Sequence, residues 1–223
     1  MSDTIAQNLQ RIKSTLPPGV ELVAVSKFHP PGAILAAYNA GQRVFGESRV
    51  TELIEKVADL PDDIKWHFIG HLQTNKVKHV VGKVHLIESV DSQRLLDLID
   101  DISLKKGVIS NILMQVHVAA EDTKYGWAPA ELLDFFRNGR HRQLKATRIC
   151  GLMGMATNTD NEMRIEADFT AIASLRDKVL SIDPTMKGFD ILSMGMSDDY
   201  PLAIKHGATH VRIGSSIFGQ RTL

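Results

Sequence analysis

Lys27 is the first residue in this sequence whose type and position could support chemistry. It follows the apolar run Val23-Ala24-Val25-Ser26. Side chains of a β-strand alternate between two faces, so Lys27 shares a face with Val23 and Val25. If that face is the buried one, partial desolvation lowers the lysine pKa and makes the amine nucleophilic towards aldehydes. The strand alone does not show which face is buried, and a lysine that ends a strand and reaches water is the alternative.

Arg212 is the second candidate, because it interrupts the apolar segment His210-Val211-Arg212-Ile213-Gly214. An arginine that points into a folded interior needs an anion or a fixed acceptor, since it stays charged. A bound anionic ligand would meet this need. A structural ion pair with Glu47 or Glu88 would meet it equally well.

Two turns of small residues favour the ligand. Gly214-Ser215-Ser216 follows the arginine directly, and Ser193-Met194-Gly195-Met196-Ser197 follows the preceding apolar segment. Such turns at the start of a helix present backbone N–H groups to a phosphate. Either turn alone could be a tight connection. Together with the arginine between them, they predict a phosphorylated ligand.

Other polar clusters favour structural roles. His67 and His71 are four residues apart across a strand and its loop, not on one helical face, so we predict no metal site. The basic segment 75–79 is typical of a solvated helix start. Asp198 and Asp199 are expected to be carboxylates at a helix start.

Composition restricts the class of protein. The 223 residues are 43% hydrophobic, and 26 Lys and Arg balance 26 Asp and Glu, so no basic surplus indicates nucleic acid. Cys150 is the only cysteine and is expected to be a buried thiol in a reducing compartment. No signal peptide and no apolar run of roughly 18 residues is found. We expect one domain over residues 1–223, in the cytoplasm, with no membrane partner and with a small-molecule ligand.

These residues must be positioned by an alternating α/β chain, because short β-branched segments alternate with helical patterns. About eight such segments occur, the number that closes a (β/α)8 TIM barrel. The predicted strands are 20–26, 43–46, 65–69, 84–89, 112–118, 147–152, 189–193 and 210–214. The predicted helices are 30–39, 92–105, 129–138, 161–180 and 197–206, with an extra N-terminal helix over 4–16 that caps the barrel or packs outside it.

An open doubly wound sheet is the alternative fold, because the order of elements does not show closure. No Gly-x-Gly-x-x-Gly follows the first strand, which disfavours it. In a barrel, strand ends and the loops after them form the site, and loops seven and eight often bind phosphate.

Several motifs together resemble one family across nearly the whole chain. They are Val23-Ala24-Val25-Ser26-Lys27, Phe45-Gly46-Glu47, residues 66–76, Ser89-Val90-Asp91-Ser92, Gly151-Leu152-Met153, residues 192–197 and Arg212-Ile213-Gly214-Ser215. In this order they resemble the pyridoxal-phosphate homeostasis proteins, the YggS/PROSC family. That family is similar to the N-terminal barrel of alanine racemase.

The resemblance implies pyridoxal 5'-phosphate (PLP) as the cofactor, held as a Schiff base on Lys27. It implies that Arg212 faces the pyridine nitrogen and that the phosphate is held by Ser193 and by the backbone of Met194, Gly214 and Ser215. A cation beside the ring nitrogen opposes its protonation and weakens the ring as an electron sink. Ser48 and His117 stand where the family commonly has asparagine, so ligand contacts at these two positions are not carried over.

The implied function is a non-catalytic PLP carrier and regulator in vitamin B6 and amino-acid homeostasis, with PLP-dependent apoenzymes as partners. We expect a monomer with no catalytic residue. An amino-acid racemase is the alternative, and such enzymes use a second acid/base from a C-terminal β domain. The sequence ends at Leu223, just past the last barrel turn, so Tyr38, Tyr125, Tyr200 or a histidine would have to serve. A phosphosugar enzyme with Glu47 or Glu88 as base is the third hypothesis.

Overall fold

A computed structural model describes residues 2–119 and 125–219. Within these ranges, parallel strands follow one another around a closed barrel, and β8 pairs with β1 through Glu21↔His210 to Ala24↔Ile213. The strands are β1 (Glu21–Val25), β2 (Val44–Glu47), β3 (Lys65–Phe68), β4 (Leu86–Val90), β5 (Ser110–Gln115), β6 (Thr147–Met153), β7 (Ile191–Ser193) and β8 (His210–Ile213). The predicted (β/α)8 barrel is confirmed, and the open-sheet alternative is wrong.

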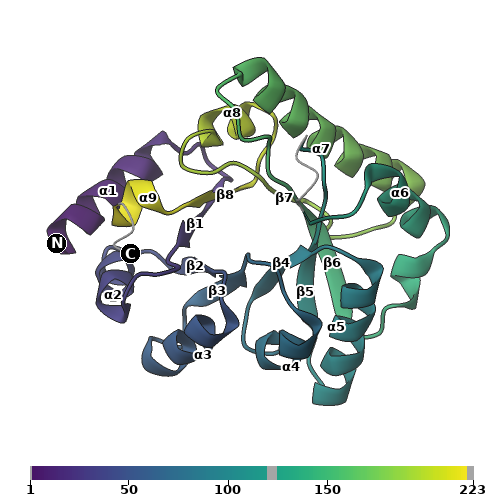
Figure 1. The fold of residues 1–223 in the computed structure, drawn as a ribbon, viewed down its shortest axis with the longest axis horizontal. Helices are drawn as coiled ribbons and strands as arrows, with labels where there is room; N and C mark the ends of the chain where they lie inside the picture. Colours follow the sequence, from purple (N-terminus) through teal and green to yellow (C-terminus); the bar gives the residue numbers. More distant parts are fainter. Residues whose placement is uncertain (1, 120–124, 220–223) are drawn as a thin grey trace.

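Helices surround the strands (Figure 1). They are α1 (Ser2–Thr15), α2 (Pro31–Asn39), α3 (Val50–Asp59), α4 (Val77–Val80), α5 (Gln93–Lys106), α6 (Pro129–Arg137), α7 (Glu162–Ile182), α8 (Tyr200–Lys205) and α9 (Ser215–Phe218), with short 3-10 turns at Thr74–Lys76 and Arg140–Gln143. Helix α8 begins three residues later than predicted, because the Met196 N–H binds the Asp199 carboxylate at 2.6 Å and holds a turn there. Among residues 2–119 and 125–219, none of the helices combines the length and the hydrophobicity of a membrane-spanning segment.

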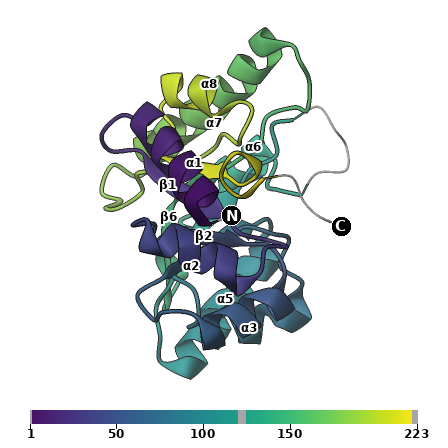
Figure 2. The same ribbon diagram turned by 90° about the vertical axis from the view of Figure 1, so that its left-hand side faces the viewer.

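The N-terminal helix α1 packs outside the barrel, against α2 and α9 (Figures 1 and 2). Its apolar face buries Ile5, Leu9 and Ile12. The amide of Asn8 donates to the Ile217 carbonyl at 3.2 Å, which links the first helix to the last one. Of the two placements that the sequence left open, packing on the outside is the one adopted.

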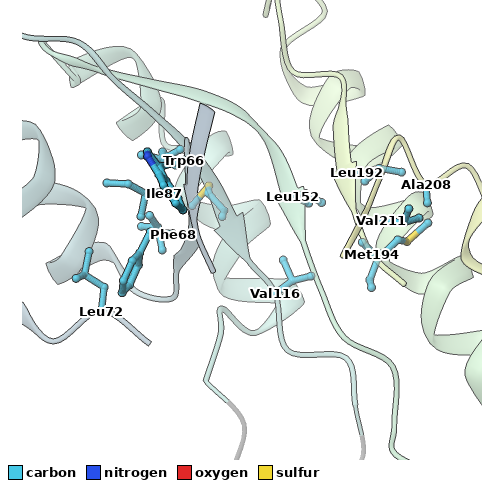
Figure 3. Packing of buried hydrophobic residues seen from close by; sticks show 14 of the residues in the cluster. Trp66, Phe68, Leu72, Ile87, Val116, Leu152, Leu192, Met194, Ala208 and Val211 are labelled. Atoms are coloured by element: carbon cyan, nitrogen blue, oxygen red, sulfur yellow. The ribbon is translucent and has the colours of Figure 1, made fainter. Parts of the chain in front are cut away.

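Buried side chains form two layers, because strand residues alternate between the helices and the barrel interior. The larger layer lies between strands and helices, and Figure 3 shows part of it, with Trp66 and Phe68 near β3 and with Leu192 and Val211 near β7 and β8. Inside the barrel, the apolar cluster is small and consists of Leu86, Leu113, Cys150 and Met153. The expected burial of Cys150 is confirmed, and burial raises the pKa of its thiol. Val23 and Val25 of β1 also face the interior, and several of the remaining interior positions carry polar side chains.

Candidate functional site

A cavity of about 270 Å³ opens where β1 and β8 end. Lys27, Arg212, Gly214 and Ser215 all line it, so four of the six residues predicted to bind a cofactor meet at one place. The pairing of β8 with β1 brings them together from opposite ends of the chain.

The barrel decides which way Lys27 points. Val25 lines the cavity, and a Cβ added to Gly46 on the neighbouring strand would lie 3.1 Å from Val23 Cγ1. Lys27 continues this inward face and lines the cavity, whereas Leu22 and Ala24 belong to the layer under the helices. Of the two directions that the sequence left open for Lys27, the inward one is adopted, and it places the amine at the mouth of the barrel.

Arg212 also points inward and is 5% exposed. Its Nη1 donates to Ser193 Oγ at 2.7 Å and its Nη2 donates to the Gly154 carbonyl at 2.9 Å. Of the two proposed ion-pair partners, Glu88 is present, with its Oε2 3.8 Å from Arg212 Nη1. Glu47 instead binds Lys56 at 2.7 Å, under helix α3. The guanidinium is thus held by fixed acceptors and one buried carboxylate.

Glu88 is the centre of a buried network inside the barrel. Its Oε1 lies 2.7 Å from His67 Nδ1, and its Oε2 accepts from Ser193 Oγ at 2.5 Å. Burial alone would raise the pKa of Glu88, but the hydrogen bond and charge of His67, the charge of Arg212 and the hydrogen bond from Ser193 outweigh it and lower the pKa to about 2. A carboxylate with so low a pKa is a weak base, which argues against Glu88 as the base of a phosphosugar enzyme.

Ser193 and Met194 do not line the cavity in the described structure. The Ser193 hydroxyl donates to Glu88 and accepts from Arg212, so it lies beneath the cavity within the buried network. The Met194 N–H donates to the His210 carbonyl at 3.1 Å, and its side chain packs beside Leu192 in the outer layer (Figure 3). The sequence pointed to Ser193 and Met194 at the start of the loop after β7, whereas the residues of this loop that line the cavity come later in it.

Met196, Ser197 and Asp198 of the loop after β7 line the cavity. Gly195 makes this possible: its φ is +94°, and an added Cβ would lie 2.6 Å from Ala203 Cβ. The Ser215 hydroxyl donates to Ser197 Oγ at 3.1 Å, so the two loops meet. The glycine in a turn of small residues was the available signal, but which serine reaches the cavity depends on the turn geometry.

The loop after β8 can approach an anion closely. An added Cβ on Gly214 would lie 3.1 Å from the Val25 carbonyl oxygen, so a side chain there would crowd β1. Ser215 begins α9; the Ile217 and Phe218 N–H groups donate to the Gly214 carbonyl at 2.9 Å, so those of Ser215 and Ser216 are the ones that the start of a helix leaves for a ligand. Backbone amides and two serine hydroxyls therefore converge at the cavity.

The remaining candidates lie elsewhere. His71 lies 3.0 Å from an Asp91 oxygen and stacks on Tyr125, so it does not converge with His67. No group of three potential metal ligands occurs among the described residues. The two positions that depart from the family pattern, Ser48 and His117, do not line the cavity in the described structure.

Comparisons with known proteins identify relatives along almost the whole chain. The family model "Alanine racemase, N-terminal domain" matches residues 1–222. The "pyridoxal phosphate homeostasis protein" of Aquifex aeolicus is 39% identical over 206 residues, covering 90% of this chain and 87% of that protein. The protein of the same name from Schizosaccharomyces pombe is also 39% identical over 206 residues, covering 91% and 84%.

Solved structures agree as well. PipY of Synechococcus elongatus, determined with PLP bound, superposes with a TM-score of 0.89 at 39% identity, covering 96% of this chain and 100% of PipY. Alanine racemase of Corynebacterium glutamicum has a TM-score of 0.80 at 12% identity, covering 98% of this chain and 62% of the enzyme, which shows a shared fold. The chain therefore belongs to the family of pyridoxal phosphate homeostasis proteins, which is built on the alanine racemase N-terminal domain.

Proposed function

We propose that this protein binds PLP in the cavity at the end of β1 and β8 and holds it for vitamin B6 and amino-acid homeostasis, without strong catalysis. The observation that carries the proposal is the meeting of an amine, a guanidinium and a cluster of hydroxyl and amide donors in one cavity of about 270 Å³. The PLP bound to PipY and the names of the curated relatives support it.

The donor set fits this cofactor. PLP brings an aldehyde that a lysine amine can attack, a pyridine ring that withdraws electrons, and a phosphate. In the proposal, Lys27 attaches the aldehyde carbon, and Arg212 lies beside the ring nitrogen. Gly214, Ser215 and Ser197 bind the phosphate. Ser193 acts through Arg212, which it holds at 2.7 Å, and Met194 belongs to the core under the helices.

Two features favour a protein that holds the cofactor over an enzyme that uses it in catalysis. Arg212 stays charged and is held by Ser193 and Gly154, so it opposes protonation of a ring nitrogen placed beside it. The three tyrosines that could serve a racemase have other positions and do not line the described cavity. Tyr38 donates to Asp63 at 2.7 Å, Tyr200 lies 3.0 Å from Thr15 Oγ1, and Tyr125 stacks on His71.

The proposal includes a monomer in the cytoplasm that passes PLP to apoenzymes. A zero formal net charge and a single buried cysteine are compatible with this setting. Analytical ultracentrifugation tests the monomer. Transfer to a PLP-dependent apoenzyme, with and without a membrane that separates the two proteins, tests whether transfer is direct.

Borohydride trapping tests the cofactor and its attachment site together. We expect the purified protein to be yellow and to lose its colour on reduction, with the reduced adduct located on Lys27 by peptide mass spectrometry. Lys27→Ala should be colourless. Lys105→Ala is the matched control, because Lys105 is exposed and its ammonium lies 2.6 Å from Asp101 Oδ2, on the surface of α5.

An adduct that persists on another lysine in Lys27→Ala would refute the attachment site. Racemisation of an amino acid at an ordinary enzyme turnover rate would refute the proposal that the protein holds PLP without strong catalysis. His29 lines the cavity and stacks on Phe218, so loss of such an activity in His29→Ala would identify it as the second acid/base.

A further inference from the structure

Helix α3 contacts the loop that carries Lys27 through one stripe of side chains. Arg49 precedes the helix, and Glu52 and Lys56 follow at intervals of three and four residues, which places the three on one helical face. We call the side chains of Arg49, Glu52 and Lys56 the α3 clamp. None of the three lines the cavity described above.

Lys56 holds the residue before Lys27. Its ammonium donates to the Ser26 carbonyl at 2.9 Å, to Glu47 Oε1 at 2.7 Å and to Glu52 Oε1 at 2.6 Å. A lysine ammonium has three protons, so these three acceptors use all of them. The side chain is almost fully buried, so water does not compete for these bonds.

Glu52 and Arg49 hold the residue after Lys27. Phe28 has a φ of +68°, a left-handed conformation that is rare for a bulky side chain and must be stabilised by its surroundings. Its N–H donates to Glu52 Oε1 at 2.6 Å, and the Arg49 guanidinium lies 4.4 Å from the centre of its ring. One carboxylate oxygen therefore joins the Phe28 backbone to the ammonium that binds Ser26.

We propose that the α3 clamp is a positioning device for Lys27. It fixes the backbone on both sides of the lysine, and so sets the direction in which the amine enters the cavity. The clamp acts through the backbone of Ser26 and Phe28 and does not touch the cavity itself. This inference rests on the proposed function, in which the amine of Lys27 attaches PLP.

Glu52→Ala tests the clamp with little disturbance of the core. It removes the acceptor of the Phe28 N–H, while Lys56 keeps Glu47 and Ser26 as partners. Glu52→Gln keeps an acceptor oxygen for the Phe28 N–H, so this variant should behave more like the parent protein than Glu52→Ala does. Asp183→Ala is the control for general loss of stability, since it removes a buried carboxylate that binds His141 and Arg142 at the opposite end of the barrel.

Two measurements on the full-length protein separate positioning from stability. Hydrogen exchange reports the Phe28 amide without cofactor. Borohydride trapping at timed intervals after PLP is added to apoprotein reports the rate of attachment to Lys27. In Glu52→Ala we expect roughly tenfold or faster exchange at Phe28, the size typical of a lost hydrogen bond to a charged group, and slower attachment. Asp183→Ala should change neither.

Unchanged exchange at Phe28 in Glu52→Ala would overturn the clamp. Faster exchange with an unchanged rate of attachment would overturn its positioning role. If Lys27 of the parent protein forms no adduct, the proposed function fails, and the exchange measurement still decides whether Glu52 holds the loop.

Discussion

Glu88 is the centre of the buried network beneath the cavity, and its replacement with glutamine removes the charge of that network's only carboxylate described above. The carboxylate lies between His67 and Arg212 and also accepts from Ser193. Glutamine has nearly the same shape but no charge, so the Arg212 guanidinium would be left buried without its carboxylate. We expect the variant to fold with lower stability.

The size of the loss follows from the pKa of Glu88, which falls from an ordinary 4.5 to about 2. At about 1.36 kcal/mol per pKa unit, this difference corresponds to about 3 kcal/mol at neutral pH. A pKa that is lower in the folded state contributes stability that is full above pH 4.5 and is lost as pH falls towards 2. The difference between parent and Glu88→Gln should therefore shrink by about 2 kcal/mol between pH 7 and pH 3.

Urea unfolding at pH 7, 5, 4 and 3, followed by the fluorescence of Trp66 and Trp127, measures this difference. Glu131→Gln is the matched control, because Glu131 is exposed on α6 and should show no such dependence. Equal stability of Glu88→Gln and parent at pH 7, or a difference that stays constant down to pH 3, would show that the Glu88 charge does not stabilise the folded protein.

Three further changes test other parts of the barrel. Burial lowers the pKa of His210 to about 4, so the parent should lose stability as pH falls from 6.5 to 4, and His210→Asn should show a smaller loss of Tm over that window. In Gly151→Ala, the added Cβ would lie 1.9 Å from the Ile191 carbonyl oxygen, so urea unfolding should show a loss of several kcal/mol, whereas Gly32→Ala, with open space around its Cβ, should show little change. Trp127→Phe removes an indole N–H that donates at 3.0 Å to a buried carbonyl of β4, and should cost roughly 1–3 kcal/mol in the same assay.

The barrel was predictable because its signals are local. Short segments rich in β-branched residues predicted strands that overlap each of the strands β1 to β8. Because helical patterns lie between these segments, the sequence also indicated parallel pairing. Helix α3 was missed, although Val50, Leu53, Ile54 and Val57 have helical spacing, because the residue before it, Arg49, is not a capping type and its side chain makes no capping bond.

The candidate site was predictable in part. Gly214 and Ser215 directly follow β8 and both line the cavity, and their contact with a cofactor stays a prediction. The turn after β7 is longer, and its path depends on Gly195 and on the bond between Met196 and Asp199. For this reason Ser197 lines the cavity, and Ser193 lies in the network beneath it.

From the sequence alone it followed that Val23 and Val25 share one strand face, that Lys27 comes just after them, and that Arg212 interrupts another strand. Only the folded barrel shows that β1 stops at Val25, two residues before Lys27, and that this face points inward, because closure of β8 onto β1 defines the interior. It also decided that Glu88 and Ser193 hold the arginine and that α3 holds the backbone around the lysine. These contacts join residues far apart in the chain, and no local pattern encodes the distances between them.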